Sequence, residues 1–458
     1  MKTFFSAKVN HEAGGALLLS LMITAILITL MGSYLNLLSS DAKSTSHSQQ
    51  WNLCLPVAES GIEEALAHIN LNGGTNLLVV HDISSGLLTD GWTSQNGVAV
   101  MRRTLPVGRY VVSISGTTGA YLIQSTGYYP SSRSATNELA RTVTVATTNI
   151  PIFVKGLLVK KTITSNGNSV IADAFDSTNP LFSNTNGQYM SSKATNGGGI
   201  ATLSTNATAL NFGSATVYGP VATGPGGSIN SSVWRIGTQA WLVANPGSGK
   251  IMPGWFTTDM NVTLPDVQPP SLGSYFTPSS GTAVYNGKTN SYNYVLSSGN
   301  YQISSGTVNG KMIVTGNATL YITSAASVNF SSSDSIIIAP GASLQLYVGS
   351  ATANLPNVVN TGTATQFTYY GLPTNTKINQ TVNADFTGNL YAPNADYTLG
   401  GNGLGYLQNI SGAAVVNTMY YNDLFSFHYD AALASLGLSR GVVVNSWKEV
   451  DPSTATVH

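Results

Sequence analysis

Charge is scarce in this chain. Only 8% of its 458 residues are Asp, Glu, Lys or Arg, against about 25% in an average soluble protein. Because 19 basic residues balance 19 acidic ones, the net charge is zero, and the chain lacks the basic surface that binds DNA or RNA. Nucleic acid is therefore excluded as a partner. With 42% hydrophobic residues the sequence also lacks the composition of a disordered protein, so its polar surface must come from Ser, Thr, Asn and Gly.

The single cysteine, Cys54, limits the covalent and metal chemistry of the chain. It has no second cysteine with which to form an internal disulfide, and no cysteine cluster is present to bind zinc. Asp173, Asp176 and Asn179 offer oxygen ligands of the kind that calcium prefers, but their spacing lacks the glycine and the terminal glutamate of an EF-hand loop. A turn held by side-chain to backbone hydrogen bonds is the preferred interpretation. We therefore expect no metal and no cofactor.

Carboxylates that could serve as a catalytic acid and base are also sparse. Enzymes that cleave polysaccharides need such carboxylates in pairs, yet the acidic residues between positions 177 and 384 are only Asp259, Asp266 and Asp334. His428 and Asp430 form a compact polar pair near the carboxyl end, without the G-x-S-x-G turn of a nucleophile. We interpret them as fastening a short helix at residues 431–436. No catalytic residue is expected.

A long uncharged run near the amino terminus is the most informative feature of the chain. Residues 16–38 (ALLLSLMITAILITLMGSYLNLL) contain no charged side chain. A helix of this length crosses the ~30 Å hydrocarbon core of a bilayer, whereas a secretory signal has a shorter apolar core of roughly 7–15 residues. We therefore predict a single-pass anchor in the lipid bilayer. Lys2 and Lys8 precede the run and would keep the amino terminus cytoplasmic, with the rest of the chain outside the cytoplasm.

Two glycines, Gly14 and Gly15, stand directly before the apolar run, which begins at Ala16. This arrangement resembles the leader of type IV pilins and pseudopilins, which is cut on the cytoplasmic side after a glycine while the hydrophobic helix stays on the mature protein. The resemblance implies prepilin peptidase as a partner and cleavage at Gly14–Gly15, the preferred bond, or at Gly15–Ala16. Residues 1–14 would then be a leader peptide, and residues 15–38 the transmembrane helix.

A second helix signal follows the anchor. Residues 57–69 (VAESGIEEALAHI) place one apolar face at the helical spacing i, i+3, i+4, i+7, formed by Ile62, Ala65, Leu66 and Ile69. Such a helix fits any globular domain, but here it also resembles the AESGxEEAL-like stretch that follows the anchor in PilX-like minor pilins. We expect residues 39–72 to form an amphipathic stem. Pro56 should kink this helix because proline lacks an N–H.

The chain departs from major pilins at one position of the membrane helix. Major pilins carry a glutamate five residues into the mature protein, where this sequence has Leu19 or Ser20, depending on the bond that is cut. A charge inside the membrane is costly and is normally kept for a partner. Its absence indicates a minor or tip-located subunit, with other pilin-like subunits as partners, rather than the repeating subunit of a filament.

The rest of the chain predicts strands. Three β-branched and aromatic runs at 109–115, 120–126 and 140–146 are separated by Gly- and Ser-rich turns, so residues 73–155 are predicted to be a small pilin-like β-subdomain with an antiparallel sheet. From residue 156 shorter strands recur without helical patterns between them. Five of these strands are predicted at 312–315, 319–323, 327–330, 335–339 and 343–348.

Strands this short favour a parallel β-solenoid over a sandwich. We predict a solenoid over residues 156–420, in which Leu320 and Ile322 point inward and Tyr321 outward. Because an open solenoid end exposes strand edges, residues 421–458 with Trp447 are predicted to cap it. The expected fold class is mainly β with an N-terminal transmembrane α-helix: a pilin-like helix and small sheet, then a parallel β-solenoid, or β-helix.

Stretches such as 386–399 (FTGNLYAPNADYTL) and 425–433 (FSFHYDAAL) resemble a β-helical exodomain that accompanies PilX-type N-termini in bacterial envelope proteins. The combined resemblance implies a non-enzymatic minor pilin- or pseudopilin-like protein of the bacterial inner membrane, pilus or cell surface. Its solenoid would be displayed for assembly or adhesion, with surface carbohydrate as a further candidate partner. Two alternatives stay open: a membrane-anchored β-helix enzyme acting on polysaccharide, and an anchored structural protein without a filament.

Overall fold

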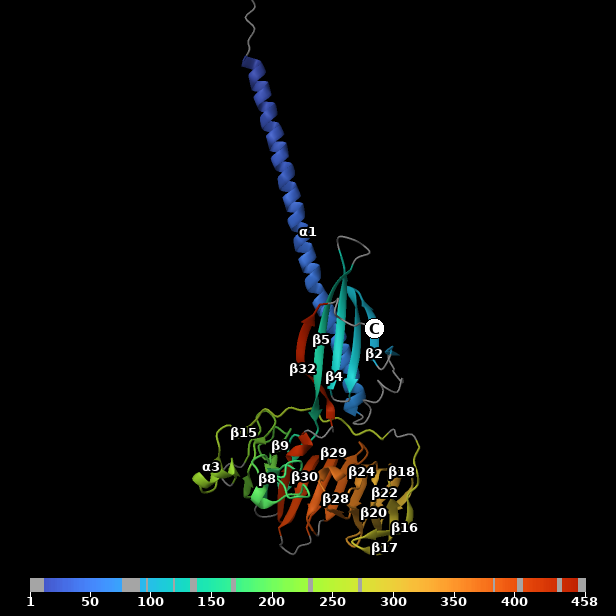
Figure 1. The fold of residues 1–458 in the computed structure, drawn as a ribbon. Helices are drawn as coiled ribbons and strands as arrows, with labels where there is room; N and C mark the ends of the chain where they lie inside the picture. The colour runs from blue at the N-terminus through green and yellow to red at the C-terminus, as the bar shows by residue number, and fades with distance from the viewer. Residues whose placement is uncertain are drawn as a thin grey trace, which may run out of the picture.

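The protein consists of one long helix, a head built on an antiparallel sheet, and a body of parallel strands (Figure 1). The structure is a computed structural model. It describes residues 12–75, 91–95, 98–117, 120–131, 138–165, 170–229, 234–270, 274–381, 384–401, 407–434 and 439–451.

Helix α1 (Glu12–Thr75) joins the apolar run to the stem without interruption. Pro56 lies inside this 64-residue helix and does not end it. Proline removes one backbone hydrogen bond, but the turns that follow pack on the head sheet, and tertiary packing supplies most of the stability of a protein helix. The anchor and the stem are therefore parts of one continuous element.

The head sheet is antiparallel, with the strand order β1-β2-β3-β4-β5-β32. The carboxyl-terminal half of α1 packs on one of its faces and closes a core that contains Ile62, Val112 and Ile123. The six strands are β1 (Thr93–Gln95), β2 (Val98–Leu105), β3 (Gly108–Thr117), β4 (Ala120–Pro130), β5 (Glu138–Pro151) and β32 (Ser439–Val450).

Glycine allows α1 to lie directly against β4. A Cβ atom at Gly127 would lie 2.3 Å from the Cys54 carbonyl oxygen and 2.4 Å from the Ala58 nitrogen. On the helix side, a Cβ atom at Gly61 would lie 2.3 Å from Oγ of Ser125. All three distances are shorter than any real contact of a Cβ atom, so the two backbones approach this closely only because neither glycine has a side chain.

Below the head, parallel strands stack in coils that have three faces, consistent with the predicted solenoid. In a complete coil the chain passes from the first face to the second and then to the third. The first face holds β17 (Lys288–Leu296), β20 (Lys311–Val314), β23 (Ser335–Ile338), β26 (Asn357–Asn360), β31 (Phe425–Asp430), β8 (Val170–Phe175), β11 (Ala215–Val217), β13 (Arg235–Ile236) and β14 (Lys250–Ile251).

The second face holds β18 (Gly299–Ile303), β21 (Asn317–Ile322), β24 (Ser343–Val348), β27 (Phe367–Gly371), β6 (Leu157–Val159), β9 (Ile200–Thr202), β12 (Val221–Ala222) and β15 (Phe256–Thr257). The third face holds β19 (Gly306–Val308), β22 (Ala326–Asn329), β25 (Thr352–Leu355), β28 (Lys377–Thr381), β7 (Ile163–Ser165) and β10 (Leu210–Asn211). Two long strands bend around the corners between faces: β29 (Phe386–Gly400) and β30 (Gln408–Tyr421).

The order of the coils in space differs from their order in the chain. The chain leaves β5 and enters the middle of the stack at β6, which pairs with β30 from much later in the sequence. It builds coils outward to β15, then returns along the segment 258–278 to the far end and builds coils back towards the middle. One coil is consequently shared, with β31 supplying its first face and β6 and β7 the other two. We call this shared coil the seam, and the described residues 258–270 and 274–278 the crossing segment.

The carboxyl-terminal segment corrects the predicted cap at residues 421–458. β31 is a strand inside the stack, and β32 runs antiparallel to β5 in the head sheet, with Trp447 opposite Val145. Because β31 ends at the seam, the chain leaves the solenoid in its middle and far from an open end. The ends carry other elements: β16 (Ser279–Tyr285) pairs antiparallel with β17, and α3 (Gln239–Ala244) precedes β14 at the opposite end.

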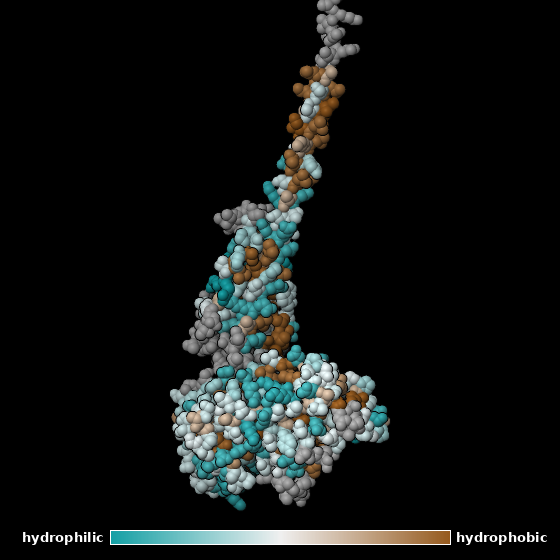
Figure 2. Space-filling model, turned by 180° about the vertical axis from the view of Figure 1, so that it is seen from behind, coloured by the Kyte–Doolittle hydropathy of each residue, from teal (hydrophilic) through white to brown (hydrophobic). Residues whose placement is uncertain are grey.

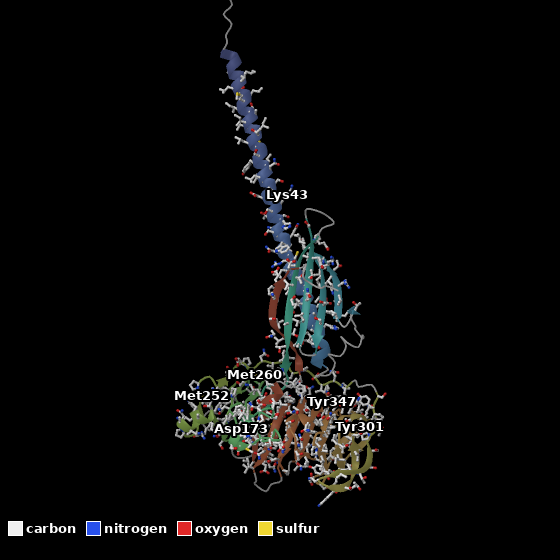
Figure 3. The ribbon with its side chains drawn as sticks, in the orientation of Figure 1. Lys43, Asp173, Met252, Met260, Tyr301 and Tyr347 are labelled. Atoms are coloured by element: carbon white, nitrogen blue, oxygen red, sulfur yellow. The ribbon has the colours of Figure 1, made fainter. Side chains whose placement is uncertain are left out.

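The interior of the solenoid is apolar, and its predicted alternation is present. Leu320 and Ile322 are fully buried in the core, whereas Tyr321 packs in a separate outer cluster. On this second face the Tyr347 and Tyr370 rings stack with centroids 4.6 Å apart. The crossing segment covers them with Leu264 and other apolar residues, and Figure 3 labels Tyr347 and Met260 at the side of the solenoid that faces the head. The described residues also include three short 3-10 helices: η1 (Ser191–Lys193), η2 (Ala364–Gln366) and η3 (Ala431–Ala434).

Candidate membrane and assembly site

The amino-terminal half of α1 presents its large apolar side chains to the outside. Between Leu17 and Leu38 these side chains are 45–71% exposed, and Figure 2 shows them in brown along the part of the helix that projects from the head. Over the described residues, α1 is the one helix that is long and apolar enough to cross a membrane. A protein surface of this size and character requires an apolar environment, such as lipid or other helices.

The serine and threonine side chains inside this segment are satisfied by the helix itself. Ser20, Thr29 and Ser33 donate their hydroxyl hydrogens to carbonyl oxygens three or four residues earlier, at 2.8–2.9 Å. Hydroxyls bonded in this way need no water. These hydroxyls therefore do not oppose the transfer of the segment into lipid.

The predicted processing residues lie at the start of the helix. Gly14, Gly15 and Ala16 are in the first turns of α1, and a Cβ atom at Gly15 would meet nothing within 4 Å. Residues 1–11 of the predicted leader lie outside the described residues, so the structure does not test the cleavage. Leu19 and Ser20, which replace the usual pilin glutamate, are both exposed within the apolar segment.

The predicted stem residues do not all have the same environment. Ile62, Ala65 and Ile69 are at most 5% exposed and pack in the head core, whereas Leu66 is only half-buried at its edge. Glu64, which the helical pattern did not single out, forms an ion pair with Arg103 and accepts a hydrogen bond from the Tyr110 hydroxyl. Burial, together with this hydrogen bond, raises the pKa of Tyr110 to about 12. Glu64 therefore ties α1 to β2 and β3.

A groove of about 490 Å³ lies between the stem and β32. Helix residues Glu59 and Glu63 line it on one side, and Val444 and Trp447 line it on the other. Both glutamates are exposed, and Trp447 is 48% exposed. No sequence signal predicts this groove, because Trp447 reaches the stem only through the pairing of β32 with β5.

The three carboxylates considered for catalysis have separate surroundings. Asp334 accepts hydrogen bonds from the backbone N–H and the hydroxyl of Ser331 within a turn. Asp266, in the crossing segment, accepts a hydrogen bond from the side chain of Asn394 in β29. Asp259 interacts electrostatically with Lys155. Among the described residues no three His, Cys, Asp or Glu side chains are grouped as metal ligands.

The calcium interpretation of Asp173, Asp176 and Asn179 is not supported. Asp176 and Asn179 accept hydrogen bonds from backbone N–H groups two residues ahead, at 2.9 and 3.0 Å, as in Asx turns. Asp173 instead pairs with His428 at 2.5 Å and accepts a hydrogen bond from the Tyr189 hydroxyl at 2.9 Å. These side chains fasten the segment between β8 and β9 onto the seam.

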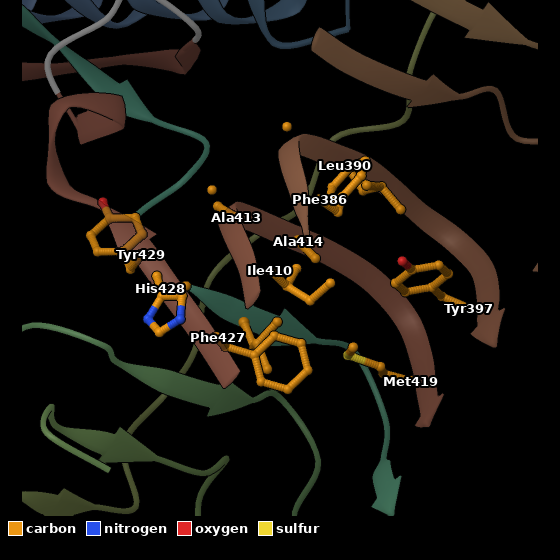
Figure 4. A pocket seen from close by; sticks show the side chains of 14 residues that line it. Phe386, Leu390, Tyr397, Ile410, Ala413, Ala414, Met419, Phe427, His428 and Tyr429 are labelled. Carbon is orange, nitrogen blue, oxygen red and sulfur yellow. The ribbon is translucent and has the colours of Figure 1, made fainter. Parts of the chain in front are cut away.

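His428 lies next to a small cavity inside the solenoid (Figure 4). The cavity is about 20 Å³ and is lined mostly by apolar side chains such as Phe386, Tyr397 and Met419. It has room for about one water molecule and is too small for an organic substrate. Asp430, the other predicted polar residue here, is fully buried; burial raises its pKa, and it accepts hydrogen bonds from the Ser177 and Ala432 backbone N–H groups.

Comparisons with known proteins cover the chain unevenly. A family model described as a domain of unknown function, DUF7305, matches residues 278–436, the part of the solenoid from β16 to η3. No curated protein matches the chain. Among solved structures, the competence-associated pilin ComZ from Thermus thermophilus aligns over 88% of this chain and 97% of its own at 11% identity, with a TM-score of 0.23. A score this low carries no argument about fold or function.

Proposed function

We propose that this chain is a non-enzymatic, minor pilin- or pseudopilin-like protein of the bacterial envelope. Its helix inserts into the inner membrane or into a type IV pilus-type filament, and its solenoid is displayed outside the cytoplasm for assembly or adhesion. The observation that carries the proposal is the division of α1. One half exposes a lipid-length apolar surface, and the other half is the core element of a small antiparallel sheet.

The partners proposed from the sequence follow from this division. The lipid bilayer or neighbouring helices would cover the apolar half of α1. Prepilin peptidase would act at Gly14–Gly15 or Gly15–Ala16, and other pilin-like subunits would contact the helix and the groove beside β32. The lack of a charge at Leu19 and Ser20 supports a minor or tip position.

If the solenoid binds surface carbohydrate, its exposed third face is a better candidate binding surface than its second face. The stacked tyrosines of the second face are at most 2% exposed beneath the crossing segment and so are not accessible to a sugar. The third face instead presents in-register rows of small polar residues, among them Thr307 and Ser327. Scattered carboxylates and a water-sized cavity favour this binding role over the polysaccharide-cleaving alternative.

Shearing and mass measurement test the proposal together. Filaments sheared from the cells are expected to contain the protein, and its amino terminus is expected to begin at Gly15 or Ala16. A variant with both Gly14→Val and Gly15→Val should keep the full leader, while Gly32→Ala within the apolar segment should be processed normally. An intact leader on the unaltered protein would refute the processing step. A processed protein found only in the inner membrane would favour the anchored structural alternative.

A further inference from the structure

Three polar side chains from distant parts of the chain meet beside the seam. Lys160 directly follows β6, Asn394 lies in β29, and Asp266 lies in the crossing segment. Nζ of Lys160 donates to the Asn394 side-chain oxygen at 2.8 Å, and the Asn394 side-chain nitrogen donates to Asp266 at 2.5 Å. The amide is thus held between an amine on its oxygen side and a carboxylate on its nitrogen side.

This arrangement places a nucleophile within hydrogen-bond reach of an electrophilic amide, and a proton carrier within hydrogen-bond reach of the same amide. A lysine amine attacks carbonyl carbons when it is uncharged, and fixed proximity replaces the improbable encounter of the two groups. Because Nζ is hydrogen-bonded to the amide oxygen, the amide carbon is its next neighbour. The carboxylate already contacts the nitrogen that must leave, which is the position required of a general acid and base.

We propose that Lys160 and Asn394 join in an intramolecular isopeptide bond, with Asp266 carrying the proton between the two nitrogens. The uncharged amine of Lys160 attacks the side-chain carbonyl carbon of Asn394 and forms the new C–N bond. Asp266 takes a proton from the attacking nitrogen and delivers it to the amide nitrogen of Asn394. The old C–N bond then breaks with its electron pair on nitrogen, the carbonyl forms again, and one ammonia molecule leaves.

The surroundings of the three residues suit this reaction. Partial burial lowers the pKa of the Lys160 amine, which increases its uncharged fraction, although the charge of Asp266 opposes the shift. Asp266 is exposed, so it can exchange protons with water between steps, whereas Lys160 and Asn394 are partly buried. The reaction occurs once in each molecule and consumes no external substrate, so it is independent of the proposed function.

The proposed bond lies where it would link the two parts of the solenoid. Lys160 belongs to the coils built outward from the seam and Asn394 to those built back towards it, and the two are 234 positions apart in sequence. β30 lies between their strands and pairs with both. A covalent bond here would join the two parts of the solenoid where they are otherwise held by noncovalent contacts. Both chain connections to the head leave from this same coil, so a load on the solenoid passes through it.

Mass spectrometry of the full chain, purified in detergent, tests the proposal directly. The intact protein is expected to weigh less than its sequence by one ammonia molecule, after allowance for any leader removal. Proteolysis should yield a branched peptide that joins Lys160 to Asn394. An unchanged mass would overturn the proposal. So would loss of ammonia with unlinked peptides, because this result would indicate a cyclic imide at Asn394.

Variants that remove one reacting group test whether the bond forms by the proposed reaction. Lys160→Arg keeps the positive charge and the hydrogen bond but removes the amine, and Asp266→Asn removes the proton carrier. Both should show the unreduced mass and run more slowly on denaturing gels, because the closed loop is lost. Lys161→Arg, at the adjacent position, should retain the full mass loss. If Asp266→Asn still formed the bond completely, the proposed role of Asp266 as proton carrier would be wrong. The measured mass answers this question whatever the stability of the variant.

Discussion

The head and the solenoid satisfy their polar side chains in different ways. The head has arginine–glutamate ion pairs, of which Arg109–Glu138 and Arg141–Glu449 have N–O distances of 2.5–2.6 Å. Between described residues of the solenoid no Lys or Arg forms an ion pair; the buried His428 imidazole is hydrogen-bonded to Asp173, and amides and hydroxyls make most of the remaining bonds. On the third face the Asn354 amide donates to Asn329 at 2.9 Å, and the Asn379 amide donates to Asn354 at 2.8 Å.

Stacking geometry explains this difference. In a parallel solenoid the same position recurs on the next coil about 4.8 Å away, so a charged residue repeated along a row would face its own charge. A neutral amide both donates and accepts, and a row of amides can therefore bond to itself. Antiparallel neighbours in the head instead bring different residues together and allow opposite charges to pair. The 8% charge content of the chain is thus a consequence of building most of it as a stack.

The largest loss of stability is expected at Gly127, where the head has no room for a side chain. In Gly127→Val the new side chain would collide with the backbone of Cys54 and Ala58 and push α1 away from β4. We expect the head to lose about 3 kcal/mol, the upper end of typical overpacking costs. Thermal unfolding in detergent should show an earlier head transition and an unchanged solenoid transition.

Gly32→Val is the matched control for this change. A Cβ atom at Gly32 meets nothing within 4 Å, so the head transition should stay in place. If Gly127→Val lowered both transitions equally, the head and the solenoid would unfold as one unit, and the contrast between them would apply to local bonding only.

The sequence predicted local features better than pairings. The uncharged run of residues 16–38 forms the amino-terminal part of helix α1, and the strand predicted at 343–348 is β24 with the same bounds, because apolar periodicity and turn residues are local signals. The prediction that residues 421–458 cap the solenoid was wrong for β32. A valine-rich strand satisfies its backbone equally well at a solenoid end or beside β5. Its partner is decided by where the chain leaves the solenoid.

The candidate sites show the same limit. The apolar anchor and most of the stem face are visible in the sequence, because their residues are close together in the chain. Lys160 and Asn394 are brought together by the order of the coils, which places β6 next to β30. Their spacing in the sequence does not predict this contact, because their distance in space depends on which coils are neighbours. The groove at Trp447 was missed for the same reason.

A smaller effect is expected from placing a charge in the amide row of the solenoid. Asn354→Asp removes the donor to Asn329 and turns a carboxylate towards the neighbouring coil. The lost hydrogen bond and the desolvated charge should together cost the solenoid about 1–2 kcal/mol, measured by denaturant unfolding. Asn309→Asp, at an exposed position between β19 and β20, is the control and should change stability by less than about 0.5 kcal/mol. Equal effects of the two variants would contradict the argument from stacking.

The smallest effect is expected at an exposed ion pair of the head. Arg141 donates to Glu449 at 2.6 and 2.7 Å and so joins β5 to β32. This hydrogen bonding lowers the pKa of the Glu449 carboxyl, with a partial opposing effect of burial and a further lowering by the arginine charge. A carboxyl whose pKa is lower in the folded state stabilises that state above its unfolded pKa, and this contribution is lost as the pH falls through the folded pKa.

Glu449→Gln should therefore weaken the head slightly at neutral pH and remove part of its stability loss between about pH 5 and pH 3. Because the pair is partly exposed and screened by solvent, the change should not exceed about 0.5 kcal/mol and should shrink in high salt. Glu63→Gln is the matched control, since Glu63 is exposed in the groove and forms no ion pair with any described residue. If both variants altered the pH dependence of head unfolding to the same extent, the effect would come from the net charge of the head. The pairing of β32 with β5 would then owe its stability to backbone hydrogen bonds and to the contact of Val442 with the core.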